Sequence, residues 1–175
     1  MTLYRNKYRI ESARLKGWDY ASNGHYFITI CVKTSSQGLC HVIDGKIKLT
    51  ETGKIIQSEW IKTGEMRKNI KLDEWIIMPD HFHAILMINN KINNPRNNLS
   101  NIIGGFKSSS TKRIHLLGYS DFEWLGRFHD HIIRNDYELA RIRKYIMDNP
   151  EKRNKNHQVQ TRCSASLPIQ SSHNI

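Results

Sequence analysis

The stretch WIIMPDHFHAILMI, residues 75–88, holds two apolar runs that are separated by Pro79 and Asp80. Runs of this length and apolarity predict two buried strands, and we expect the Pro-Asp break to join them as an antiparallel pair. Alternation along the second strand divides its side chains between two faces, with His81, His83, Ile85 and Met87 on one face and Phe82, Ala84 and Leu86 on the other. The centre of the predicted sheet therefore carries a pair of histidines.

His81 and His83 are adjacent positions on the same face of that strand. Two imidazoles held on one rigid strand can converge on a single metal ion, and imidazole is the commonest protein ligand for such ions. The alternative is that they are two polar side chains at the exposed start of a strand. The pair alone leaves both interpretations open.

The remaining periodicity predicts an α+β fold, in which helices pack on one or both faces of an antiparallel sheet. Asp44-Gly45 is a strong signal for a two-residue hairpin turn, and Thr50 or Thr52 can cap the helix that follows. The expected elements are strands at 25–32, 39–43, 46–49, 72–78, 83–88 and 128–134, and helices from about residue 50 to Met66, over 99–117 and over 137–149.

Composition divides the chain into a basic N-terminal arm (residues 1–24), one folded domain (25–150) and a polar, flexible C-terminal tail (151–175). The 175 residues carry a formal net charge of +11, which favours a polyanionic partner but also fits a generally basic surface. The three cysteines form no CxxC pair, so no zinc knuckle is predicted. The N-terminus has no apolar run typical of a signal peptide, and we expect a cytoplasmic protein.

Two regions combine cations with groups suited to nucleic acid. In the arm, Arg14 and Lys16 are interleaved with aromatic residues, which favour base stacking. The helix predicted over 99–117 carries Lys107, Lys112 and Arg113 among serines and a threonine, and such a run suits phosphate oxygens. A solvated helix face is the alternative.

On the last predicted helix, Arg141, Tyr145 and Asn149 recur every four residues and therefore share a face. A phenol can act as a covalent nucleophile, and an amide oxygen is an acceptable ligand for a hard divalent cation. The alternative is a half-buried tyrosine followed by an asparagine at the helix C-terminus.

Three motifs stand in the order found in one known family: MPDHFH at 78–83, FHDHIIR at 128–134 and RKYIMDNP at 143–150. With RLKGWDY at 14–20, YFITIC at 26–31 and GFKS at 105–108, they extend the likeness from about Leu15 to Pro150. The chain resembles the REP-associated tyrosine transposases, which belong to the insertion-sequence-200-like branch of the HUH single-strand nucleases.

The resemblance implies an RRM-like or ferredoxin-like sheet with the histidine strand near its centre. It implies that His81, His83 and Asn149 hold one Mg²⁺ or Mn²⁺, and that Tyr145 cleaves single-stranded DNA beside a REP-type hairpin through a 5′-phosphotyrosine intermediate. His131, Arg134 and Arg141 are expected to contact DNA or to orient the site. Members of that family work as monomers or homodimers. Because they bind DNA, the resemblance also implies that this protein associates with the nucleoid.

Several alternatives remain open on the sequence. Tyr137 lies on the same predicted helix and could be the nucleophile, although the residue four positions later is an arginine, which cannot bind a metal. His129 and His131 repeat the His-x-His spacing and could complete a zinc site with His81 and His83. Two other functions fit the same scaffold: a DNA-hairpin-binding regulatory protein without transposition activity, and an RNA-binding module.

Overall fold

The computed structural model describes residues 15–90 and 97–150; the first 14 residues, including Arg14, residues 91–96 and the C-terminal tail lie outside the described residues. The described chain forms an α+β fold, as the sequence predicted. Its elements are β1 (Gly24–Thr34), β2 (Cys40–Ile43), β3 (Lys46–Leu49), α1 (Glu51–Glu65), β4 (Ile70–Ile77), β5 (His81–Ile88), α2 (Leu99–Leu116), β6 (Glu123–Trp124), β7 (His129–Ile133) and α3 (Asp136–Met147).

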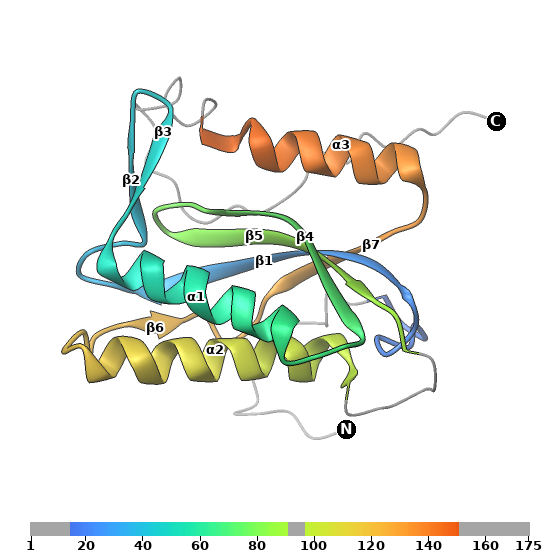
Figure 1. Cartoon of the computed structure of the whole chain (residues 1–175), viewed down its shortest axis with the longest axis horizontal. Coiled ribbons are helices and arrows are strands. Elements are labelled where there is room, and N and C mark those ends of the chain that lie inside the picture. Colours follow the sequence, from blue (N-terminus) through green and yellow to red (C-terminus); the bar gives the residue numbers. More distant parts are fainter. Residues whose placement is uncertain (1–14, 91–96, 151–175) are drawn as a thin grey trace, which may run out of the picture.

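β1 is the central strand of an antiparallel sheet of five strands (Figure 1). One edge of β1 pairs with β5, which in turn pairs with β4. The other edge pairs with β7 along residues 25–29 and with the short β6 at Val32 and Thr34. β2 and β3 form a separate hairpin that stands beside the sheet. The histidine strand β5 thus lies next to the centre.

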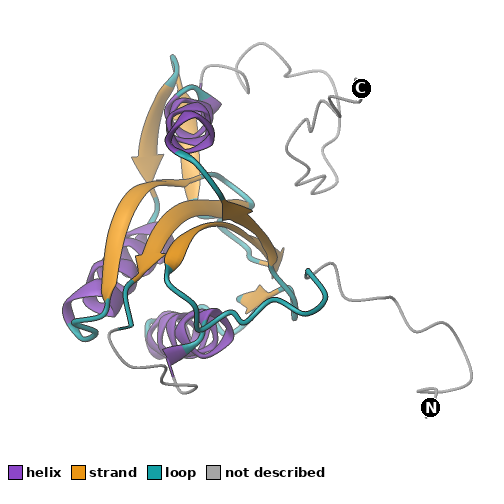
Figure 2. Cartoon of the chain, turned by 90° about the vertical axis from the view of Figure 1, so that its right-hand side faces the viewer, coloured by secondary structure: helices purple, strands orange, loops and turns teal. Residues whose placement is uncertain are grey.

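Helices cover both faces of the sheet: α1 and α2 lie on one face and α3 on the other (Figure 2). The larger core fills the α1/α2 face and includes Phe82 and Trp60, which are both fully buried. A smaller core under α3 is built by Phe27 and Ile85 of the sheet together with Leu139, Ile142 and Ile146 of the helix. Alternation in β5 therefore directs its side chains to two different cores, as predicted.

Local sequence explains how the elements begin and turn. Asp44 and Gly45 have φ angles of 50° and 72°, the left-handed pair that a tight hairpin turn requires. Thr50 caps α1 by accepting a hydrogen bond from the backbone N–H of Gly53 at 3.2 Å. Asn98 and Asn135 cap α2 and α3 in the same way.

β4 contains a bulge that the sequence did not reveal. Its pairing with β5 shifts between Leu72 and Trp75, so that Asp73 and Glu74 together oppose the single residue Ile85. Leu72 and Trp75 both pack against the α1/α2 core, although they are three positions apart. The bulge compensates for that odd spacing and leaves Asp73 on the side of α3, to which it is hydrogen-bonded.

Three details differ from the prediction. Glu123 and Trp124, expected in a connection, form β6 because they pair with the end of β1. Leu117, the last residue of the helix expected over 99–117, is 58% exposed just after the end of α2. α3 ends at Met147 rather than at 149, with Asp148 as its C-cap. None of the described helices is long and apolar enough to span a membrane.

Candidate active site

His81 and His83 lie side by side on the α3 face of the sheet. Their ring centroids are 4.5 Å apart, and the planes meet at 67°. His83 is 3% exposed, whereas the side chain of His81 is 17% exposed. The strand therefore presents two converging imidazoles, one deep and one closer to the surface.

Each imidazole is held at Nδ1 by a neighbouring side chain. His81 Nδ1 is 2.9 Å from Oδ1 of Asp80, and His83 Nδ1 is 2.7 Å from the hydroxyl of Thr29 on β1. A carboxylate only accepts, so His81 must carry its proton on Nδ1 and, when neutral, its lone pair on Nε2. Such partners fix the ring orientation of histidines that bind metals. The donor set therefore fits a metal ion bound through Nε2.

Burial keeps His83 neutral. Desolvation, together with the positive charge that His81 can acquire, lowers the pKa of His83 to about 3, and Asp80 opposes the shift in part. A neutral imidazole is the form that coordinates a metal.

Tyr145 of α3 packs directly against this pair. Its ring centroid is 5.6 Å from that of His83 and 6.2 Å from that of Phe27, and both contacts are edge-on. Phe27 in turn stacks on His83 at 5.3 Å. A phenol from the last helix therefore lies beside the imidazole of a strand that is about 60 residues earlier in the chain.

Asn149 follows the end of α3 and is half-buried. The expectation that one continuous helix carries Tyr145 and Asn149 is wrong, because a turn at Asp148 intervenes. Asp148 caps α3 in a right-handed conformation, and Asn149 and Pro150 are helical again after it, so the interruption is a single turn. Asn149 as a metal ligand stays a prediction.

The two alternatives for the site gain no support. Tyr137, the other tyrosine on α3, is 82% exposed near the start of the helix. Within residues 15–90 and 97–150, no three His, Cys, Asp or Glu side chains are grouped so that they could hold a metal ion. The four-histidine zinc site with His129 and His131 is therefore not assembled.

Three residues predicted to contact DNA lie at or near the α3 face. His131 stands opposite Phe27 in the register of β7, and its Nε2 is 2.8 Å from Oε1 of Glu138 on α3. Arg134 and Arg141 are exposed, and the backbone N–H of Arg134 donates to the other oxygen of Glu138. Glu138 thus ties the start of α3 to β7.

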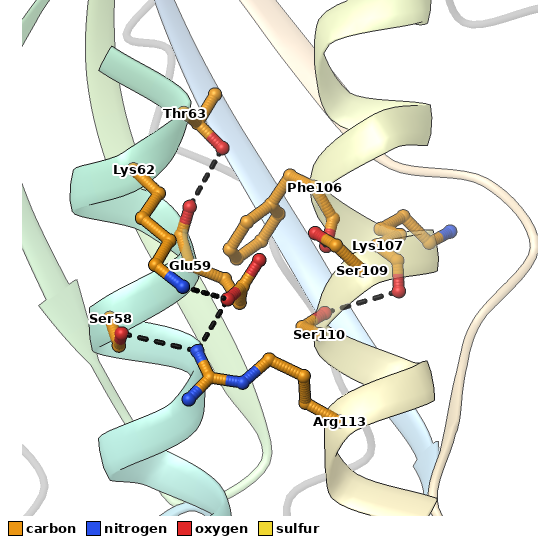
Figure 3. A network of polar contacts seen from close by, with 9 residues as sticks. All are labelled: Ser58, Glu59, Lys62, Thr63, Phe106, Lys107, Ser109, Ser110 and Arg113. Atoms are coloured by element: carbon orange, nitrogen blue, oxygen red, sulfur yellow. Dashed lines mark hydrogen bonds and ion pairs between the residues drawn. The ribbon is translucent and has the colours of Figure 1, made fainter. Parts of the chain in front are cut away.

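The predicted cations on α2 lie on the opposite face of the sheet, and two of them have partners within the protein. Arg113 forms a salt bridge to Glu59 of α1, whose side chain is only 8% exposed (Figure 3). Lys107 donates to the backbone carbonyls of Leu125 and Gly126, and burial lowers its pKa. Both residues therefore help to hold the fold, and DNA contact by either stays a prediction.

Lys112 is exposed and lines an open groove of ≈ 670 Å³ between α2 and β6. The other lining residues come from both elements: Lys107, Ser108, Thr111, His115, Leu116, Glu123 and Trp124. Cations and hydroxyls on one wall suit phosphate oxygens. Lys16 is also exposed, whereas Arg14 lies outside the described residues.

Sequence reasoning missed the residues that hold others in place. Asp80 and Thr29 orient the two imidazoles, and Asp73 and Glu138 bind α3 to the sheet. Asp80 could have been found, because it directly precedes His81. Thr29 gave a weaker signal, a hydroxyl within an otherwise apolar strand.

Comparison with known proteins places the chain in a family. The family described as "Transposase IS200 like" matches residues 23–149, nearly the whole described domain. The chain belongs to the IS200-like transposase family. An uncharacterized protein of Haemophilus influenzae is 29% identical over 156 residues, which are 79% of this chain and 87% of that protein.

This IS200-like transposase also shares its fold with a solved structure. A REP-associated tyrosine transposase bound to a REP hairpin superposes with a TM-score of 0.60 at 22% identity. The match covers 82% of this chain and 74% of the other. The predicted RRM-like arrangement, with the histidine strand beside the central strand, is therefore confirmed as the fold of this family.

Proposed function

We propose that this IS200-like transposase is a metal-dependent single-strand DNA endonuclease and strand transferase, with Tyr145 as its nucleophile. The observation that carries the proposal is the 5.6 Å approach of the Tyr145 ring to His83, which itself lies 4.5 Å from His81. A phenol is a weak nucleophile at neutral pH, and its placement beside candidate metal ligands would overcome that weakness.

His81 and His83 would hold one Mg²⁺ or Mn²⁺ through Nε2, with Asn149 as a third ligand. When bound, the ion supplies charge that polarises the scissile phosphate. Asp80 and Thr29 keep both rings in the orientation that binding needs. Packing against Phe27 restricts the Tyr145 ring, so the phenol is positioned before DNA arrives.

In the proposed reaction, Tyr145 Oη forms a bond to phosphorus and the bond from phosphorus to the 3′ oxygen breaks. The phenol loses its proton and the departing 3′ oxygen gains one. The products are a 5′-phosphotyrosine link and a free 3′-OH. Because the link conserves the energy of the phosphodiester bond, attack by another 3′-OH can rejoin strands.

The proposed substrate is a REP-type DNA hairpin with a single-stranded flank, and it would contact both faces of the sheet. The α2 groove, with Lys112 and Lys107, would take the phosphates of the paired stem, and Arg113 would add positive charge nearby. β6 joins β1 at Val32, directly after the residue paired with His81, so groove and histidines lie at the same end of the sheet. His131, Arg134, Arg141 and Lys16 would contact the single strand. The protein would act as a monomer or homodimer.

The test uses a set of labelled oligonucleotides, each an imperfect hairpin with single-stranded flanks, incubated with the protein and Mn²⁺. We expect a covalent protein–DNA band that survives denaturing electrophoresis. Tyr145→Phe should lose the band completely, because phenylalanine has no oxygen to attack phosphorus. Tyr137→Phe is the matched control, and it should keep the band.

Each other result has a defined meaning. Hairpin binding without a covalent band, for the wild type and for every oligonucleotide, would favour a regulatory DNA-binding protein on this scaffold. Tighter binding to RNA of matched sequence would favour an RNA-binding module. A band that persists in Tyr145→Phe would remove Tyr145 from the mechanism.

A further inference from the structure

Asp73 and Arg143 form a fork-to-fork ion pair between the sheet and α3. Arg143 Nε donates to Oδ1 of Asp73 at 2.9 Å, and Nη2 donates to Oδ2 at 2.6 Å. The Asp73 side chain is 17% exposed and that of Arg143 is 43% exposed. Two parallel charge-assisted hydrogen bonds fix the relative orientation of both groups, which a single contact cannot do.

The bulge in β4 prepares Asp73 for this contact. Oδ1 of Asp73 also accepts the backbone N–H of Glu74 at 2.7 Å, so the carboxylate is oriented by its own strand. Consistent with that geometry, the hydrogen bonds from Arg143 lower the pKa of Asp73, and burial opposes them only in part. The acceptor is therefore ionised and rigid.

Arg143 and Tyr145 leave α3 on opposite flanks. They are two residues apart, which is about 200° around an α-helix. Arg143 reaches β4, whereas Tyr145 reaches β5 and β1, on the other side of the helix. Between them, Ile142 and Ile146 pack on the sheet, and apolar contacts of that kind tolerate some rolling of the helix.

A small roll of α3 would displace the phenol. The hydroxyl of a tyrosine lies on the order of 9 Å from its helix axis, so a roll of about 20° moves it by about 3 Å. A misplacement of about 1 Å can cost on the order of 100-fold in rate. Glu138 ties the first turn of α3 to β7, whereas Asp73 and Arg143 tie the later part of the helix, next to Tyr145, to β4.

We propose that the Asp73–Arg143 ion pair is a positioning device that sets the rotation of α3 and thereby holds the Tyr145 phenol against His83. This inference rests on the proposed function, because it assigns the pair to the reaction of Tyr145. Neither residue is a catalytic residue: both act through the helix that carries the nucleophile.

The test compares Asp73→Asn, Arg143→Gln and the double variant in single-turnover formation of the covalent band with Mn²⁺ and a hairpin oligonucleotide. We expect each single variant to slow the reaction at least 10-fold, with the Kd for the oligonucleotide changed less than 3-fold. The double variant should be no slower than either single one, because both remove the same contact. Glu74→Gln, which removes the same charge from the neighbouring residue of the bulge, should react at the wild-type rate.

Asp73 separates positioning from direct DNA contact. If Arg143 acts by binding phosphate, Asp73→Asn leaves the rate unchanged or increases it, and that result would overturn the proposal. A second readout is ¹⁹F NMR of 3-fluorotyrosine placed at position 145 in the full chain. The signal should broaden or shift in Asp73→Asn but not in Glu74→Gln, and an unchanged signal in Asp73→Asn would also overturn the proposal.

The proposed function and the positioning role of the ion pair can be disproved independently. If the wild-type protein forms no covalent band with any oligonucleotide, the proposed function fails. The NMR measurement would still decide whether the ion pair restrains Tyr145.

Discussion

The two faces of the sheet use the same strands for different purposes. On the α1/α2 face, β1 and β5 contribute Tyr26, Ile28 and Phe82, each completely buried in the larger core, where Phe82 contacts Trp60 of α1 and Phe106 of α2. On the α3 face, the same strands contribute Thr29, His81 and His83, and a single helix covers them. The α1/α2 face therefore stabilises the fold by burying apolar side chains, and the α3 face accommodates polar side chains.

This difference indicates how the candidate active site can be built on a stable sheet. The α1/α2 core removes large apolar side chains from water, which is the dominant stabilising term in folding. The α3 face buries imidazoles whose Nδ1 atoms are satisfied by Asp80 and Thr29, so it loses little stability. Substitutions on the two faces should consequently separate activity from stability.

The largest effect should come from His81→Ala, which removes a proposed metal ligand. We expect covalent-band formation to fall below detection and Mn²⁺ binding, measured by calorimetry, to weaken at least 100-fold. The free energy of unfolding should change by less than about 1 kcal/mol, because the Asp80 partner is 35% exposed and stays hydrated. His41→Ala, at an exposed histidine of β2, is the control; unfolding of His81→Ala would show that both faces are structural.

The neighbouring residue on the opposite face should behave in the reverse way. Phe82→Ala should lower the free energy of unfolding by about 3–5 kcal/mol, because it leaves a cavity between Trp60 and Phe106. Denaturation in urea measures this loss. Phe82→Leu should cost less than about 1.5 kcal/mol, since it fills much of the same volume. A small loss in Phe82→Ala would mean that the α1/α2 core can collapse around the gap.

A smaller effect should come from the ion pair between α1 and α2. Burial raises the pKa of Glu59, but the hydrogen bonds from Arg113 and Lys62 outweigh it, and the pKa is lowered below 4.5 (Figure 3). A carboxylate whose pKa is lowered in the folded state stabilises the fold at pH values above its pKa in the unfolded chain. That stabilisation is lost as the pH falls through the pKa of the folded state. Glu59→Gln should therefore cost about 1–3 kcal/mol at pH 7, and progressively less below about pH 4.5.

Glu65→Gln, at an exposed position of the same helix, should show no such pH dependence. Both variants should cleave DNA normally at pH 7, since neither residue lies on the α3 face or lines the α2 groove. A loss of cleavage in Glu59→Gln would mean that the two faces are coupled.

Most of the fold could be predicted from local patterns. Alternation assigned the residues of β5 to the correct faces, and Asp44-Gly45 and Thr50 marked a turn and a cap, because each of these signals acts within a few residues. The bulge at Asp73 and the strand β6 were not predictable, since both depend on pairing with distant strands.

In the candidate site, too, local spacing was predictable and contacts between distant elements were not. The spacing of His81 and His83 predicted converging imidazoles, because a strand is regular over that distance. The α2 cations were expected to face DNA, yet Arg113 and Lys107 bind Glu59 and backbone carbonyls. A sequence reports that a side chain is charged, but the packing of another helix decides which partner it meets.

The order of elements along the chain has a consequence for synthesis. Within the described residues, the strands and both helices of the larger core precede Asn135, and α3 with Tyr145 follows them. A nascent chain can therefore expose every described strand of its sheet before α3, with the proposed nucleophile Tyr145, has left the ribosome. Premature termination after Ile133 would leave the histidine pair without Tyr145, so we expect an incomplete copy of this transposase to be unable to carry out the proposed cleavage.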